Sequence, residues 1–385
     1  MKEIEKYDSP FSKVSAKKKA YQGAFPLLDL SIGEEKEAPN PLILKKVKKA
    51  MENVQNQKYP DDGWSGLIPH FCAHMKRRYQ ADVPSSSVMI GCGAKALLWD
   101  TMSYLIQEGD IVVVTTPAYD VVEKIARIQK AEVIVLPLKK ELENLPDLSS
   151  LPMKIWKKVK LLSLNFPNNP TGSYPDEVFF EELTRIWKKC SFYLLNDAAY
   201  MALRYDEHVL PLWNRYGSSS RFIEIYSASK AYNLTGFRLG FLLANPHLIE
   251  DLKVVRNLYD SGTYLPLQYG FAEALDHEEI IDALKEKYHR RLVRMQEILH
   301  IFRYPSIFPK GSFYLYTGIP ENRRWKNATQ FADALLQYAG ILVVPFDKGE
   351  GGLRFSMTYS TPNEEEFFQE FRRRLILFED FLSQY

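Results

Sequence analysis

A lysine in the second half of the chain is the residue best suited to covalent chemistry. Lys230 ends the run Ser227-Ala-Ser-Lys230, which follows an apolar stretch, and Arg238 comes soon after in Gly236-Phe-Arg238-Leu-Gly240. A lysine amine can hold an aldehyde as a Schiff base and can later act as a general base. The hydroxyls of Ser227 and Ser229 and the planar guanidinium of Arg238 are donors that suit a phosphate. The spacing therefore predicts a site for an aldehyde cofactor that also carries phosphate.

A glycine-rich turn supplies a second candidate for the phosphate. Gly91-Cys-Gly93-Ala94-Lys95 ends an apolar run and opens an amphipathic stretch that continues to Gln107. Backbone N–H groups at such a helix start bind anions, although the same glycines also occur in plain turns. Because the Lys230 motif accompanies this turn, we expect Gly93, Ala94 and Lys95 to face the phosphate.

An aspartate and two asparagine-containing segments complete the set. Asp197 follows an apolar run, which predicts that its carboxylate lies at the C-terminal edge of a sheet, where ligands of open α/β folds bind; a helix N-cap is the alternative. It belongs to Asn196-Asp197-Ala-Ala-Tyr200, and Asn165-Phe-Pro-Asn-Asn169-Pro-Thr-Gly172 precedes it. With the Lys230 motif, these segments resemble the class I/II aminotransferases, the fold-type-I enzymes that use pyridoxal 5'-phosphate (PLP). The likeness runs along nearly the whole chain.

The resemblance implies a role for each residue around PLP. Lys230, Asp197 and Tyr200 are the expected catalytic residues. Asp197 would pair with the pyridine nitrogen, Tyr200 and Asn169 would hydrogen-bond the phenolic oxygen, and Tyr119 would stack on the ring, with a core tyrosine as the alternative for Tyr119. The phosphate would be held by Gly93, Ala94, Lys95, Ser227, Ser229 and Arg238.

The resemblance also implies how substrate and a second subunit bind. Arg354, in Gly352-Leu-Arg354-Phe-Ser356, resembles the family arginine that grips the substrate α-carboxylate, unless it is only a surface strand residue. Gly33 and Asn169 match positions that help bind the same group. Tyr59 matches a tyrosine that reaches the PLP phosphate of the neighbouring subunit, and residues 260–264 resemble a second segment lent across that interface. We therefore expect a homodimer with shared active sites.

The reaction has more than one interpretation. The leading one is ping-pong transamination between an L-amino acid and a 2-oxo acid; β-elimination by a C–S lyase on the same scaffold is the alternative. A transcription regulator is disfavoured because no helix-turn-helix pattern precedes the large domain. The motif phrasing is closest to bacterial aspartate and LL-diaminopimelate aminotransferases, but no second cation is securely placed for a distal carboxylate. The aromatic side chains that could instead line an apolar pocket are Tyr21, Phe25, Trp64 and Tyr264, so the substrate stays open.

The elements that must position these residues are predicted by hydrophobic periodicity. Apolar runs alternate with amphipathic stretches between residues 46 and 275, which indicates a mostly parallel sheet covered by helices on both faces. We expect an α/β large domain there, with seven strands at Val88 to Gly91, Ile111 to Thr115, Glu132 to Leu136, Lys160 to Asn165, Phe192 to Leu195, Phe222 to Ser227 and Leu239 to Leu243.

The pattern changes after Asp276. A long charged helix at about 278–302 is followed by strand-like runs at 312–317, 341–345 and 352–358 and by helices at about 327–338 and 364–383. Residues 276–385 therefore form an α+β small domain, and we expect residues 1–45, which have little periodicity, to pack with it.

Composition limits the partners and the location. The 385 residues include 50 Lys and Arg against 48 Asp and Glu, a net charge of +2, which gives no electrostatic reason to expect nucleic acid or an anionic membrane. Three scattered cysteines are too few for a disulfide framework or a zinc site, so we expect no metal and a reducing, cytoplasmic location. No apolar run reaches the ~18 to 20 residues of a membrane helix, and the chain is expected to be soluble.

Overall fold

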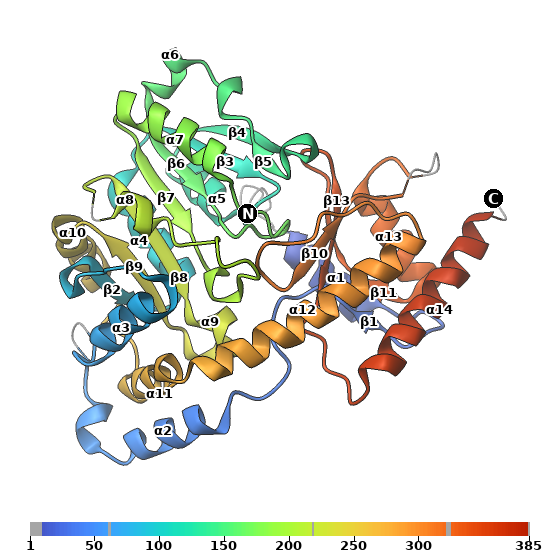
Figure 1. Cartoon of the computed structure of the whole chain (residues 1–385), viewed down its shortest axis with the longest axis horizontal. Coiled ribbons are helices and arrows are strands. Elements are labelled where there is room, and N and C mark those ends of the chain that lie inside the picture. The colour runs from blue at the N-terminus through green and yellow to red at the C-terminus, as the bar shows by residue number, and fades with distance from the viewer. Residues whose placement is uncertain (1–9, 61–62, 218, 321–324, 384–385) are drawn as a thin grey trace.

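The computed structural model describes residues 10–60, 63–217, 219–320 and 325–383 of the chain. The strands of its largest sheet are β2 (Val88–Gly91), β3 (Ile111–Thr116), β4 (Glu132–Lys139), β5 (Leu145–Pro146), β6 (Val159–Leu164), β7 (Tyr193–Asp197), β8 (Phe222–Ser227) and β9 (Gly240–Ala244). They are ordered β2-β9-β8-β7-β6-β3-β4-β5 (Figure 1). All seven predicted runs form strands, and the two-residue β5 adds an eighth at the edge, which the sequence did not predict.

The central strands of this sheet are parallel, and both faces of the sheet are buried. Strands β4, β3, β6, β7 and β8 are parallel to their neighbours in this series, whereas β9 and β5 run antiparallel to the strands beside them. Successive side chains of a strand point to opposite faces, and in β3 Val113 packs into one core cluster while Val112 and Val114 pack into another. Both faces are therefore apolar, which explains the continuous β-branched run of β3.

Helices cover both faces of this sheet. Residues of α4 (Ala94–Leu105), α5 (Val121–Ile128) and α10 (Pro246–Asn257) pack in the cluster that holds Val112 and Val114. The opposite cluster includes residues of α3 (Leu67–Tyr79), α7 (Glu177–Lys189) and α11 (Leu265–Asp276). Figure 1 shows α2 (Pro41–Met51) lying beside α11 at the outer side of this unit.

Side chains cap the starts of α7 and α10, whereas the start of α4 has no side-chain cap. The Asp176 side chain accepts a hydrogen bond from the N–H of Phe179 at the start of α7, and Asn245 caps α10 ahead of Pro246. These are favoured residues for the N-cap and first-turn positions. Helix α4 differs, because its N-cap is Gly93 and no side chain caps it.

The C-terminal third builds a second, smaller unit. Its long helix α12 (Glu278–Ile301) runs from α11 towards a three-stranded antiparallel sheet, ordered β10-β13-β12 (Figure 1). The other elements of this unit are β10 (Tyr314–Thr317), α13 (Ala328–Ala339), β11 (Ile341–Leu342), β12 (Val344–Phe346), β13 (Gly352–Ser356) and α14 (Glu364–Ser383). From the N-terminal segment, β1 (Leu28–Asp29) pairs in parallel with β11, and α1 (Pro10–Ala20) packs on β12.

No helix in the described part of the chain combines the length and apolar character needed to cross a membrane.

Candidate active site

The C-terminal edge of the large sheet gathers most of the predicted residues. Because β6, β7 and β8 are parallel, the segments that follow Leu164, Asp197 and Ser227 all leave the sheet at this edge. A cavity of about 610 Å³ opens there. The predicted site residues that line it are Gly33, Ala94, Lys95, Tyr119, Asn169, Asp197, Tyr200, Ser227, Ser229, Lys230, Arg238 and Arg354.

Lys230 has an environment that favours its neutral amine. It lies in the short helix α9 (Ala228–Ala231), directly after β8. Its Nζ donates a hydrogen bond to the carbonyl oxygen of Gly33 across 2.7 Å. Burial, together with the positive charge of Arg354, lowers the pKa of Lys230 to about 8. A lysine with this pKa has an appreciable neutral fraction near physiological pH, which both nucleophilic attack and general base catalysis require.

Asp197 is a buried carboxylate held from both sides. The Ala199 N–H donates to its Oδ1 at 3.1 Å, and Asn165 Nδ2 donates to its backbone oxygen at 2.8 Å. Only 6% of Asp197 is exposed, and this burial raises its pKa to about 6, although the Ala199 hydrogen bond and the charge of Lys230 oppose the shift. A cationic group bound in the cavity, such as a protonated pyridine, would offset the burial and favour the ionised carboxylate.

Two glycines lie in close contact with Arg238 and with the start of α4. Gly93 has a φ of +83°, and a Cβ at this position would lie 2.7 Å from Nη2 of Arg238. A Cβ at Gly240, which pairs with both Gly91 and Ser227, would lie 2.8 Å from the backbone nitrogen of Ala94. Glycine is thus needed at both positions. The uncapped start of α4 adds donors and a positive dipole end, and together these groups fit the phosphate of PLP.

Arg354 projects into the cavity from the small unit. Its side chain is buried, and it donates from Nη1 to Oδ1 of Asn169 at 2.9 Å and from Nη2 to the Ser31 oxygen at 2.7 Å. The Arg354 Cζ lies 3.9 Å from the centroid of the Tyr314 ring. The guanidinium is therefore held rigidly at the cavity wall, where its planar fork suits a carboxylate.

Tyr314 is a cavity residue that sequence reasoning missed. Its hydroxyl accepts a hydrogen bond from the Tyr200 hydroxyl at 3.0 Å, and a Cβ at Gly33 would lie 1.7 Å from its oxygen. Burial and the nearby Tyr314 raise the pKa of Tyr200 well above its ordinary value, so Tyr200 remains a hydrogen-bond donor. The strand pattern of residues 312–317 does not separate Tyr314 from a core aromatic.

Tyr119 lies on the wall of the cavity, and Nζ of Lys95 is 5.8 Å from its ring centroid. Burial, with Asp197 nearby, raises the pKa of Tyr119, which keeps the phenol neutral. A neutral aromatic face at this wall suits stacking on a planar ring.

Two sets of aromatic residues lie outside this cavity in the single chain. Tyr59 is 82% exposed and does not line it. Tyr21, Phe25, Trp64 and Tyr264, which could line an apolar substrate pocket, do not line this cavity in the single chain. Trp64 instead stacks on Tyr269 with ring centroids 4.0 Å apart, and the Tyr264 hydroxyl donates to Gln57 Oε1 at 2.8 Å.

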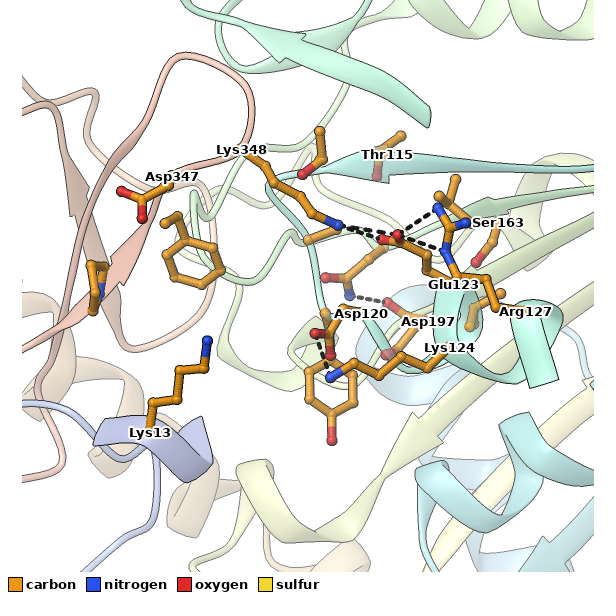
Figure 2. Close-up of a pocket in the computed structure, with 18 of the residues that line it drawn as sticks. Lys13, Thr115, Asp120, Glu123, Lys124, Arg127, Ser163, Asp197, Asp347 and Lys348 are labelled. Atoms are coloured by element: carbon orange, nitrogen blue, oxygen red, sulfur yellow. Dashed lines mark hydrogen bonds and ion pairs between the residues drawn. The ribbon is translucent and has the colours of Figure 1, made fainter. Parts of the chain in front are cut away.

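A second cavity of about 360 Å³ adjoins the first (Figure 2). Tyr119 and Asp197 line both, but Lys230 and Arg238 line only the first, so the first cavity holds the candidate chemistry. Figure 2 shows Lys348 reaching Glu123 of α5, with Nζ 3.1 and 3.3 Å from the two carboxylate oxygens.

The loop that carries Lys348 connects the two units. It joins β12 to β13, and its Glu350 accepts a hydrogen bond from the Lys140 backbone N–H at 3.2 Å and forms an ion pair with Lys140 Nζ at 3.3 Å. The hairpin that positions Arg354 is thereby fixed to the large unit at its tip.

The described residues contain no cluster of three or more His, Cys, Asp or Glu side chains that could hold a metal ion.

Comparison with known proteins agrees with this geometry. The family model for aminotransferase class I and II matches residues 26–371. An LL-diaminopimelate aminotransferase of Methanocaldococcus jannaschii is 33% identical over 91% of this chain and 87% of its own length. The substrate-bound structure of BacF from Bacillus subtilis superposes with a TM-score of 0.84 at 27% identity, covering 97% of this chain and 94% of BacF. A probable N-succinyldiaminopimelate aminotransferase from Thermus thermophilus gives a TM-score of 0.82 at 26% identity, covering 95% of this chain and 99% of its own.

These matches favour transamination over the C–S lyase alternative, because the named relatives are aminotransferases. They also agree with the α/β architecture and the PLP requirement expected from the motifs. The chain therefore belongs to the class I and II aminotransferase family, and it is a PLP-dependent enzyme that transfers an amino group between an amino acid and a 2-oxo acid.

Proposed function

We propose that Lys230 and Asp197 perform the amino transfer on an L-amino acid whose α-carboxylate is bound by Arg354. When bound, PLP supplies an aldehyde that accepts the amino group and a ring that withdraws electrons from the reacting carbon. The observation that carries the proposal is that Lys230, Asp197, Arg238 and Arg354 line one cavity. This single space has a nucleophilic amine, a ring-nitrogen partner, a phosphate donor and a carboxylate donor.

Each side chain has a defined task in this proposal. The amine of Lys230 would remove the proton from the substrate α-carbon and hold it for return, for which its lowered pKa is suited. The carboxylate of Asp197 holds the proton on the ring nitrogen. Tyr200 and Asn169 donate to the phenolic oxygen, while Tyr119 covers the ring face. Ser227, Ser229, Arg238 and the backbone of residues 93–95 hold the phosphate.

The substrate is held at the boundary of the two units. Arg354 would exchange its contact with Asn169 for the substrate carboxylate or share both. Because Gly33 has no Cβ, the Tyr314 hydroxyl can pack directly against its backbone at this site. The same contacts serve the amino acid in the first half-reaction and the oxo acid in the second. This reuse of one carboxylate site supports a ping-pong mechanism.

LL-diaminopimelate is the first amino donor to test. The relatives named LL-diaminopimelate aminotransferase are 29 to 33% identical to this chain. Glu34 and Lys95 also line the cavity and offer charges of both signs to a side chain that ends in an amine and a carboxylate.

We further propose a homodimer whose subunits share their active sites. The exposed Tyr59 and the bond between Tyr264 and Gln57 support this, because the two segments matched to the family interface lie next to each other. Large apolar side chains within about 20 residues of these two segments in the sequence are exposed: Leu42, Met51, Val54, Leu258 and Tyr259. Exposed large apolar side chains near both segments support a protein partner there.

The domain division and the location are proposals as well. Separate core clusters around Phe241 and around Phe355 support a large domain at 46–275 and a small domain at 276–385 joined by residues 1–45. Helix α2 begins before the first boundary, at Pro41. The free thiols of Cys72, Cys92 and Cys190 support a reducing cytoplasmic location.

The central test combines labelling with a substrate panel. Borohydride reduction of the holoenzyme should attach the cofactor to Lys230, and attachment at any other lysine overturns the assignment. Lys230→Ala should still bind PLP through the phosphate donors but lose turnover by several powers of ten, since one residue supplies both attachment and proton transfer. Single-turnover absorbance of the wild-type cofactor with LL-diaminopimelate, aspartate, glutamate and an aromatic amino acid identifies the donor. If LL-diaminopimelate gives the slowest change, that substrate proposal is wrong.

A further inference from the structure

A buried carboxylate lies behind the catalytic edge of the sheet. Glu224 is in the middle of β8 and has no exposed surface. Its Oε1 accepts hydrogen bonds from Asn196 Nδ2 and from the Leu212 N–H, each at 2.9 Å. Its Oε2 accepts from the Trp213 N–H and the Tyr226 hydroxyl, also at 2.9 Å. Burial raises the pKa of Glu224, and these four donors oppose the shift by stabilising the ionised form.

Glu224 determines which way the amide of Asn196 points. Asn196 Oδ1 accepts from the Phe166 N–H at 3.0 Å, while its Nδ2 donates to Glu224 and, at 3.3 Å, to the Phe166 oxygen. If the amide turned over, its oxygen would face the carboxylate and its NH₂ would face the Phe166 N–H. Both contacts would be repulsive, so the carboxylate excludes that orientation.

The Phe166 backbone belongs to the loop that carries active-site contacts. One residue before it, Asn165 donates to the backbone of Asp197 and accepts from the Asn169 N–H at 2.8 Å. Asn169 in turn accepts from Arg354. Glu224 is therefore connected to Asp197 and Asn169 by hydrogen bonds through Asn196, by the covalent step from Phe166 to Asn165, and by the hydrogen bonds of Asn165.

We propose that Glu224 is a positioning residue for the active site, because it fixes the Asn196 amide and thereby the loop that holds Asn165 and Asn169 against β7. The inference rests on the proposed function of Asp197 and Arg354. Glu224 itself does not line the catalytic cavity, so it acts through the loop and not on substrate.

Two substitutions at this position separate positioning from core stability. Glu224→Met is similar in size but removes every acceptor, so Asn196 loses its anchor. Glu224→Gln keeps one oxygen for Asn196, and its NH₂ can donate to the Tyr226 hydroxyl, while the Trp213 N–H loses its acceptor. Both variants should be less stable than the wild type, but only the Met variant should disturb the loop.

The main readout is hydrogen exchange of the Phe166 amide in PLP-free protein, which does not depend on catalysis. We expect about tenfold faster exchange in Glu224→Met, the equivalent of one ordinary hydrogen bond, and near wild-type exchange in Glu224→Gln. The dissociation constant for PLP should likewise be larger in Glu224→Met than in Glu224→Gln, which should remain close to the wild type. Trp187→Phe is the control for stability, because it removes a buried hydrogen bond to the Phe192 oxygen outside this series.

The outcomes are distinguishable. Equal Phe166 exchange and PLP affinity in Glu224→Met and Trp187→Phe would show that Glu224 only supports the core, which overturns the inference. If Glu224→Met does not fold, Asn196→Ala replaces it in the experiment. Asn196→Ala should also speed exchange of the Phe166 amide about tenfold, and unchanged exchange in this variant overturns the inference. A wild type that fails to bind PLP contradicts the proposed function but leaves the exchange result decisive for Glu224.

Discussion

Arg354 and Asn169 are joined by a hydrogen bond of 2.9 Å although they lie 185 positions apart in the chain. Arg354 belongs to the small antiparallel sheet, and Asn169 to the loop after β6 of the large one. The candidate carboxylate site is therefore assembled from both units. Each unit supplies one residue of the pair, so neither unit alone contains the complete site.

We expect Arg354→Ala to lower kcat/KM for amino and oxo acids by about one to three powers of ten, the usual effect of losing a buried charged hydrogen-bond partner. PLP affinity should change little, because the proposed phosphate donors lie elsewhere in the cavity. Arg354→Lys should recover only part of the loss, since an ammonium lacks the planar fork. Steady-state kinetics measure this effect, with a primary amine without a carboxylate as the control substrate. An equal loss with the control amine would show that Arg354 only supports its strand.

Asp197 should make the PLP-free protein less stable at neutral pH. Its pKa is raised by burial to about 6 in the folded state, above the ~3.9 of an unfolded aspartate. The folded protein then binds the proton more tightly, so this contribution to stability is fully present below pH ~4 and is lost as the pH rises to ~6. Asp197→Asn should remove this dependence and stabilise PLP-free protein at neutral pH by about 1 to 3 kcal/mol, while weakening PLP binding.

Chemical denaturation of the PLP-free proteins across this pH range measures the effect. Asp147→Asn is a control of opposite sign, because hydrogen bonds from Ser149 and Lys139 lower the pKa of Asp147. If the stability of Asp197→Asn relative to the wild type does not increase as the pH rises from ~4 to ~7, the burial argument is wrong.

The ion pair between Lys348 and Glu123 should help to hold the hairpin that carries Arg354 against the large unit. Lys348→Met is expected to raise the KM for amino acids by about twofold to fivefold, as for a partly exposed pair, with little change in kcat. The difference should shrink at high ionic strength. Arg127→Met is the matched control, because Arg127 contacts the same carboxylate from within α5 and does not bridge the units. Equal KM values in both variants would show that the bridge does not influence substrate binding.

The sequence predicted the large sheet well because its strands are buried on both faces. Runs such as Ile111–Thr116 are β-branched at every position and apolar over their first four residues, so they stand out without knowledge of their neighbours. The residues at the ends of β7 and β8 were then recognisable from motif spacing. Short elements were missed where the signal depends on distant contacts, as in β5, whose two residues pair with Leu138 and Lys139.

Helix α1 shows why the N-terminal segment was harder to predict. Among its residues with described burial, Val14 is the one buried side chain, and it packs against Leu336, Leu342 and Val344 of the small unit. One apolar contact per helix gives no repeating stripe, so periodicity cannot reveal it. Tyr314 was missed for a related reason, since its role comes from Gly33 and Arg354, which are far from it in sequence.

The shared active site gives the most demanding prediction. If Tyr59 serves the partner subunit, mixing Lys230→Ala with Tyr59→Phe subunits should produce heterodimers in which one site carries both lesions and the other carries none. Activity should then exceed the sum of the two parent preparations. Each homodimer must first be shown to be impaired, and mass spectrometry of differently tagged subunits must show that they exchange. If exchange is complete and activity still equals that sum, Tyr59 acts within its own subunit and the two sites are independent.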